Sequence, residues 1–141
     1  MRPQRGFTFI TFLLFLGLGA GIFWIVTYGG AYMDNFEVKS ILSQAANMAY
    51  QEQLDEKVHA FVFRKLHEKF DVDVQQPGGK MTRELEIDAP PENLRIERTK
   101  SPAHIDIWFT YSRDVRQPLT GAIKTLTFNH HAEQDLSPTK W

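Results

Sequence analysis

The chemistry open to this chain depends first on its five histidines, because imidazole binds metal ions and transfers protons near neutral pH. His59 and His67 lie eight residues apart in a segment with helical spacing, so two helical turns separate them. Two metal ligands on one helix reach a common ion when they are about four residues apart, one turn. We therefore expect these two histidines not to share a metal ion.

The other three histidines lie in segments with strand spacing. His130 and His131 are neighbours, so their side chains should point to opposite faces of a sheet. A site made of His104, His130 and Glu133 on two strands is conceivable, but no metal-ligand spacing accompanies it. We expect no metal and no other cofactor, and we expect these histidines to pair with neighbours or to face solvent.

Other catalytic arrangements are not indicated either. Serines occur at positions 40, 43, 101, 112 and 137, and none lies in a Gly-x-Ser-x-Gly turn. The Pro-Gly-Gly-Lys stretch at 77–80 lacks the spacing of a phosphate-binding loop, and Asp71 and Asp73 lack the rest of a calcium loop. The chain has no cysteine, which excludes thiolate chemistry and disulfides. The sequence therefore predicts that the protein is not an enzyme.

The strongest pattern in the chain is an uncharged apolar stretch near its start. No formal charge occurs between Phe7 and Met33, and thirteen of the residues from Phe7 to Tyr28 are Leu, Ile, Phe or Val. A helix over Phe7–Tyr28 would be roughly 33 Å long, enough for a hydrocarbon core of about 30 Å. Those thirteen residues favour insertion by on the order of 4–8 kcal/mol. We predict a transmembrane helix at 7–30, preceded by a short tail at 1–6.

The flanking charges predict the orientation of this helix. Arg2 and Arg5 precede it, whereas Asp34, Glu37 and Lys39 follow it. The positive-inside rule then places the tail in the cytoplasm and the rest of the chain in the periplasm, for a bacterial inner membrane. A cleaved signal peptide is the alternative, but its apolar region is usually about 7–15 residues long.

The residues after the span have the composition of one small domain. All seventeen acidic residues and fourteen of the sixteen basic ones lie there, so the domain is mildly acidic. A net negative domain has no overall attraction for nucleic acid or for anionic lipid. The sequence therefore predicts no nucleic-acid partner. The predicted partner of the apolar helix is the lipid bilayer.

The spacing of apolar residues after the span predicts helices over 31–74. Apolar residues recur at helical intervals from Val38 to Ala49 and again from Leu54 to Phe70. Gly29-Gly30 should loosen or break the first helix, since each glycine costs about 1 kcal/mol relative to alanine. Whether Gln51–Gln53 forms a turn or continues the helix is left open by the sequence.

The period then changes to two, which predicts an antiparallel β-meander over 82–136. Ile105, Ile107, Phe109 and Tyr111 alternate with more polar residues, and turn residues separate the strands. One apolar face of such a sheet must be covered, and the amphipathic helices can cover it. We predict an α+β fold: a single N-terminal transmembrane helix followed by amphipathic helices packed on a small antiparallel sheet.

Two glycines inside the span indicate a possible partner. Gly17 and Gly21 form a small-xxx-small pair, which lets a second transmembrane helix approach closely. Such pairs are frequent in membrane helices, so the motif alone is weakly specific. The predicted contact is with another membrane protein, or with a second copy of this chain.

The start of the chain resembles the processing site of type IV pilins and pseudopilins, in which a short basic leader ends in Gly before Phe-Thr-Leu-Ile-Glu. The corresponding residues are Arg5-Gly6-Phe7-Thr8-Phe9-Ile10. The resemblance implies cleavage after Gly6 and assembly into a filament. In that family a glutamate, fifth after the cleavage point, is thought to pair with the neighbouring subunit's N-terminal amine. Thr11 stands there in this chain, which argues against ordinary filament assembly and leaves an atypical tip subunit.

A second resemblance extends over nearly the whole chain. It is to a family of short, single-span bacterial proteins of unknown function, often encoded beside the leader peptidase. The matching segments occur in the family's order and are Tyr32–Lys39, Lys69–Val72, Asn93–Arg98 and Tyr111–Gly121. The resemblance implies membrane attachment but no activity, so no functional residue follows from it.

Together these observations favour a non-enzymatic, membrane-anchored accessory or structural subunit of a larger membrane assembly. A pilin-like or pseudopilin-like subunit of a secretion or filament system is the alternative. A third hypothesis, a ligand-binding periplasmic domain, would need a pocket between the helices and the sheet.

Overall fold

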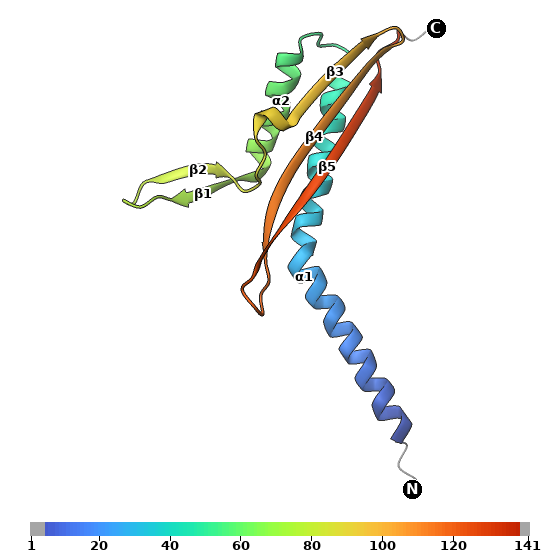
Figure 1. The fold of residues 1–141 in the computed structure, drawn as a ribbon, viewed down its shortest axis with the longest axis vertical. Helices are drawn as coiled ribbons and strands as arrows, with labels where there is room; N and C mark the ends of the chain where they lie inside the picture. Colours follow the sequence, from blue (N-terminus) through green and yellow to red (C-terminus); the bar gives the residue numbers. More distant parts are fainter. Residues whose placement is uncertain (1–4, 139–141) are drawn as a thin grey trace.

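The computed structural model describes residues 5–138, with side chains from residue 8 onward. The fold is α+β, as predicted: a long apolar helix, a second helix and two small antiparallel sheets (Figure 1). Residues 1–4 of the predicted tail lie outside the described residues, and the first helix already begins at Arg5. The elements are α1 (Arg5–Met48), α2 (Asp55–Phe70), β1 (Asp71–Gln75), β2 (Met81–Leu85), a 3₁₀ turn (Pro91–Asn93), β3 (Leu94–Lys100), β4 (Ala103–Arg116) and β5 (Ile123–Asp135).

Helix α1 is continuous through Gly29-Gly30, so the alternative in which these glycines break the helix is wrong, and the helix extends well beyond the span predicted at 7–30. Two glycines disfavour a helix by about 2 kcal/mol in total, and burial of the next turns against the domain, beginning at Ala31, offsets this cost. Figure 1 shows the axis of α1 changing direction between its free half and its packed half. Close to this change, the Thr27 hydroxyl donates to the carbonyl of Phe23 (2.7 Å), a contact that often bends helices.

The predicted apolar stripes of the two helices form the core. Residues spaced by three and four on α1, and by four on α2, are buried at the same cluster. Leu54, expected to begin the second stripe, is exposed and precedes α2. The buried helical residues are Ala31, Val38, Ile41, Leu42, Ala45 and Ala46 of α1, and Val58, Val62, Leu66 and Phe70 of α2; Ala49, just after α1, is buried with them.

Strand β1 corrects two predicted boundaries. The helical region expected to reach residue 74 ends at Phe70, and Asp71–Gln75 pairs with Met81–Leu85 in a separate two-stranded sheet. The meander expected over 82–136 is therefore three-stranded and contains only β3, β4 and β5. Hairpin β1–β2 closes locally, with the Gln76 amide donating to the Lys80 carbonyl at 2.9 Å. Because the loop is short, closing this hairpin costs little conformational entropy. The hairpin projects from the domain (Figure 1).

The three-stranded sheet has one buried and one accessible face. Ile105, Ile107, Phe109 and Tyr111 on β4 are fully buried, as their alternation predicted. The packed half of α1 and helix α2 cover this face (Figure 1). The sheet and the helices thus form two layers around one core.

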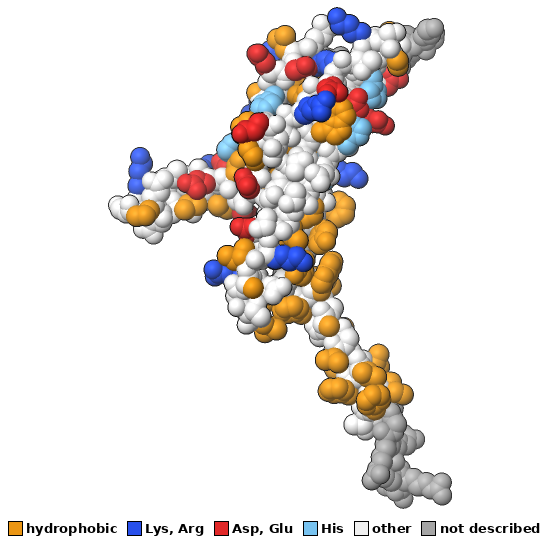
Figure 2. Space-filling view, viewed as in Figure 1, with side chains coloured by type: hydrophobic (Ala, Val, Ile, Leu, Met, Phe, Trp, Pro, Cys, Tyr) orange, Lys and Arg blue, Asp and Glu red, His pale blue; other side chains and the backbone are white. Residues whose placement is uncertain are grey.

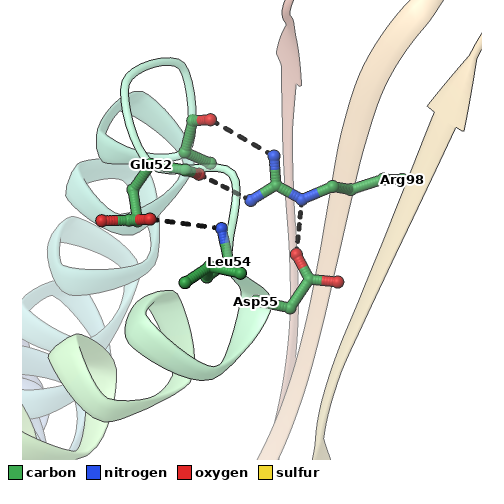
Figure 3. Close-up of polar contacts among 5 residues, drawn as sticks. Glu52, Leu54, Asp55 and Arg98 are labelled. Atoms are coloured by element: carbon green, nitrogen blue, oxygen red, sulfur yellow. Dashed lines mark hydrogen bonds and ion pairs between the residues drawn. The ribbon is translucent and has the colours of Figure 1, made fainter.

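Arg98 of β3 holds the connection between the helices (Figure 3). Its guanidinium donates to the carbonyls of Ala49 (3.3 Å) and Glu52 (2.8 Å) and pairs with the carboxylate of Asp55. The Glu52 carboxylate accepts from the Leu54 amide at 3.3 Å. Gln51–Gln53, left open by the sequence, therefore belongs to a turn and loop, and a strand residue more than forty positions away fixes its course.

Candidate functional site

The free half of α1 is an apolar surface exposed on all sides. Thr8–Met48 is the one helix among the described residues that is long and apolar enough to cross a membrane, and its most apolar 18-residue window has a mean hydropathy of 2.4. No residue of that window is buried within the chain. About 23 residues, 8–30, precede the first buried residue, Ala31, and they span roughly 34 Å. Figure 2 shows hydrophobic side chains along this half of the helix.

The two glycines singled out in the sequence lie on one face of this exposed half. A Cβ atom built at Gly17 or Gly21 would meet no side chain and no other element of the fold within 4 Å, so both positions are open. Gly19 is equally open and, two residues away, points to a different face. The predicted contact with a second helix at Gly17 and Gly21 stays a prediction, because this is a single chain.

Where α1 reaches the domain, aromatic rings follow one face of it. The ring of Trp24 lies 5.9 Å from that of Tyr28 and 5.6 Å from that of Tyr32. Tyr32 in turn meets Phe128 of β5 edge to face at 5.9 Å. Tyr and Trp rings are enriched where membrane meets water, because each has an apolar body and a polar tip.

Two residues beyond Tyr32, an ion pair joins α1 to the sheet. The Arg113 guanidinium of β4 contacts the Asp34 carboxylate of α1 and, at 2.8 Å, the carboxylate of Glu86. The side chains of Arg113 and Asp34 are only 17% and 23% exposed, so water screens this pair weakly. Burial lowers the pKa of Arg113 from its usual range, but the guanidinium stays charged at neutral pH.

A polar group lies beside this ion pair, between α1 and the sheet. The side-chain oxygen of Asn35 accepts from the Tyr111 hydroxyl (3.3 Å) and from His130 Nε2 (2.6 Å). Burial, with a smaller contribution from Lys39, lowers the pKa of His130. Burial also raises the pKa of the Tyr111 phenol. Burial thus favours the uncharged imidazole of His130, and donation to the Asn35 oxygen requires the tautomer with the proton on Nε2.

The structure brings together a histidine–carboxylate cluster that differs from the one considered in the sequence. His104 lies 3.4 Å from Asp106 and 3.8 Å from Glu133, while His131 lies 2.7 Å from Asp106. His130 and His131 point to opposite faces, as predicted, but His130 points to the buried face and contacts Asn35, so the expected group of His104, His130 and Glu133 is not formed.

Three of these side chains could hold a metal ion, since the ligand atoms of His104, Asp106 and Glu133 lie within 4.8 Å of one another. The hydrogen bond from His131, and the nearby charge and hydrogen bond of His104, lower the pKa of Asp106. As they stand, the imidazoles and carboxylates pair with one another on the accessible face of the sheet.

The other candidates for chemistry do not converge. His59 contacts the carbonyl of Pro91 at 3.3 Å, whereas His67 pairs with Asp71 at 2.7 Å, so they do not meet, as expected from their spacing. Asp71 caps the C-terminus of α2 and begins strand β1, and Asp73 of the same strand pairs with Arg83 (3.4 Å).

A groove of about 400 Å³ lies between α1 and β5. Lys39 and Asn47 on α1 and Glu133 on β5 are among its lining residues, and its surface is more polar than apolar. Most sites for small molecules are largely apolar with a few polar groups, so this groove has little of their character.

The fold, and the contacts that join α1 to the sheet, define a class of protein. It is a small α+β domain built around the end of an apolar helix that could cross a membrane. No protein-family model, curated protein or solved structure matches the chain. The two family resemblances found in the sequence therefore remain predictions.

Proposed function

We propose that this chain is a non-enzymatic, membrane-anchored accessory or structural subunit of a larger membrane protein assembly. Residues 7–30 hold it in the bacterial inner membrane, with the N-terminus in the cytoplasm and the domain in the periplasm. One observation supports this most: an exposed apolar helix of membrane-spanning length continues unbroken into the core of the domain. An anchor continuous with a core couples the position of the domain to any helix that packs on α1.

The orientation follows from the charges that flank the helix. Arg2 and Arg5 lie on the N-terminal side, and the first charge on the other side is Asp34. The positive-inside rule favours retention of the arginines in the cytoplasm. Protease added to cells whose inner membrane is intact but whose periplasm is accessible tests this placement. The domain should be digested there together with a periplasmic control protein. A domain that is digested only after the inner membrane is opened would contradict it.

The open face at Gly17 and Gly21 is where we place the partner helix. Small residues let two backbones approach, and van der Waals packing then replaces contact with lipid. A leucine at either position fills this face without weakening the helix, because leucine is a better helix former than glycine by roughly 0.8 kcal/mol.

Co-purification in mild detergent tests the partner. The native chain should bring down a stoichiometric membrane protein, or itself, and Gly17→Leu or Gly21→Leu should lose it. Gly19→Leu is the matched control, since it adds the same side chain to a different face of the helix. A monomer at native expression level, or equal loss from all three variants, would contradict the proposed helix contact.

A pilin-like subunit is the second candidate, and the continuity of α1 supports it. A single helix that is free along one half and packed along the other can bundle through its free half with copies of itself while the domains lie outside. Mass spectrometry of the mature protein separates the two candidates. A chain that begins at methylated Phe7 supports the pilin-like subunit, and an intact start near Met1 rejects it.

A further inference from the structure

The tip of hairpin β4–β5 combines exposed apolar side chains with cations. Leu119 is 83% exposed and Ile123 is 61% exposed. Arg116 and Lys124, one on each strand, are exposed beside them. Between residues 115 and 124 the chain carries these two positive charges and no carboxylate. A surface of this kind suits an anionic bilayer, where apolar residues enter the headgroup boundary and cations meet lipid phosphates.

The tip holds its shape through its own hydrogen bonds. The Gln117 amide donates to the Ala122 carbonyl and the Gly121 amide donates to the Gln117 carbonyl, both at 2.8 Å. Gly121 has a φ of +67°, a backbone conformation that residues with a Cβ rarely adopt. Leu119 is thus presented at the end of an ordered turn.

The tip lies at the level of α1 where the aromatic rings begin. The Gln117 side-chain amide donates to the Tyr28 hydroxyl at 3.3 Å, and Lys124 Nζ lies 5.8 Å from the centre of the Tyr28 ring. Tyr28 ends the densely apolar stretch of the helix. Figure 2 shows Lys and Arg side chains together with hydrophobic ones at this end of the domain. If α1 crosses a bilayer, the tip therefore reaches its surface.

The carboxylate closest along the chain to this tip is Asp114, which accepts a hydrogen bond from Thr125 at 2.5 Å. On α1, the carboxylate of Asp34 is paired with Arg113. Among the described residues neither Arg116 nor Lys124 has a carboxylate partner; Lys124 lies over the Tyr28 ring, and both positive charges remain open to an external anion.

We propose that the β4–β5 tip is a second membrane contact of this protein. Leu119 enters the headgroup region of the bilayer that holds α1, and Arg116 and Lys124 bind lipid phosphates. This inference rests on the proposed membrane anchoring. Two contacts, the helix and the tip, fix the tilt of the domain against the membrane, which one helix alone does not do.

Because the chain has no cysteine, single cysteines can report on this contact. The full chain is reconstituted in vesicles of phosphatidylcholine and phosphatidylglycerol, with an environment-sensitive fluorophore on Leu119→Cys. Met81→Cys is the matched control, because Met81 is also apolar and exposed (60%) but lies on the projecting β1–β2 hairpin. Leu18→Cys reports on the anchor itself. The readouts are the emission wavelength and quenching by iodide in water or by nitroxide lipids.

We expect the label at position 119 to emit at shorter wavelength than the label at 81, to lose iodide quenching and to be quenched by nitroxides near the headgroups. Adding Arg116→Gln and Lys124→Gln should restore part of the iodide quenching. Water exposure at 119 equal to that at 81, with position 18 in the acyl region, overturns the tip contact alone. Water exposure at position 18 overturns the anchoring as well. Unchanged protection at 119 in the glutamine variant overturns the role of the two cations.

Discussion

Asp34 on α1 and Arg113 on β4 form an ion pair at the point where the helix leaves the sheet, and both side chains are mostly shielded from water. The pair joins α1 to β4, the middle strand of the three-stranded sheet. Arg113 also contacts Glu86, so three segments of the chain meet at one guanidinium. The position of the domain relative to its helix depends on this contact and on the apolar packing above it.

Removal of one partner of this pair should destabilise the protein. Asp34→Ala leaves Arg113 shielded with only Glu86 for charge compensation, and we expect a loss of about 1–3 kcal/mol in the free energy of unfolding. Urea unfolding in detergent micelles measures it. Arg113→Ala and the double variant complete a thermodynamic cycle. Strictly additive losses would mean that the two residues do not interact.

Arg98 should stabilise the turn between α1 and α2. Arg98→Ala removes donors to the carbonyls of Ala49 and Glu52, so we expect a loss of about 1–3 kcal/mol and faster amide exchange in that turn. Arg95→Ala on the same strand is the control, because its side chain is 70% exposed and its pairing with Glu97 should contribute about 0–1 kcal/mol. Equal effects of the two substitutions would contradict the role given to Arg98.

The same substitution, leucine to alanine, should destabilise the protein in the core but not at the exposed β4–β5 tip. Leu66 on α2 is fully buried, so Leu66→Ala should cost about 2–5 kcal/mol in the free energy of unfolding. Leu119→Ala deletes the same atoms from an exposed tip and should change it by less than about 0.5 kcal/mol. Thermal unfolding followed by circular dichroism compares them. A large loss from Leu119→Ala would show that the tip packs within the domain.

Acid should weaken the domain through His130. Burial lowers the pKa of His130 in the folded protein below the 6.5 of an unperturbed histidine, so the unfolded chain binds a proton first as the pH falls. This contribution to stability is complete above pH 6.5 and is lost as the pH falls toward the folded pKa.

The variant His130→Gln tests this pH dependence. It removes the titrating group, so the free energy of unfolding should fall less steeply below pH 6.5 than in the native chain. The imidazole signals of the native chain, followed by NMR, give the folded pKa directly. Parallel pH profiles for the two proteins would contradict the assignment.

Much of the fold could be predicted because its helices and strands follow from the local spacing of apolar residues. The change from a spacing of three and four to a spacing of two separated α1 and α2 from β3–β5, and the buried face of β4 followed directly from its alternation. The expectations that failed were at boundaries. At Gly29-Gly30 a local helix-breaking tendency was outweighed by packing of the following turns, and at Asp71 a local hairpin replaced the end of a helix.

The histidine–carboxylate cluster also could be predicted only in part. Alternation correctly placed His130 and His131 on opposite faces, but it could not say which of them would meet His104. That choice depends on the register of β4 against β5, where Asp106 lies opposite Glu133. A shift of one residue would exchange the two histidines.

The sequence by itself determined the apolar helix, its flanking charges and the two-layer α+β domain, because each depends on residues close together in the chain. Only the tertiary structure decided which side chains meet at the end of the domain where the free half of α1 begins. Gln117 reaches Tyr28 across 89 positions, and Arg113 pairs with Asp34, through the lengths and register of β4 and β5. The net charge of the domain concealed the cationic tip, because a sum over the chain carries no information about position.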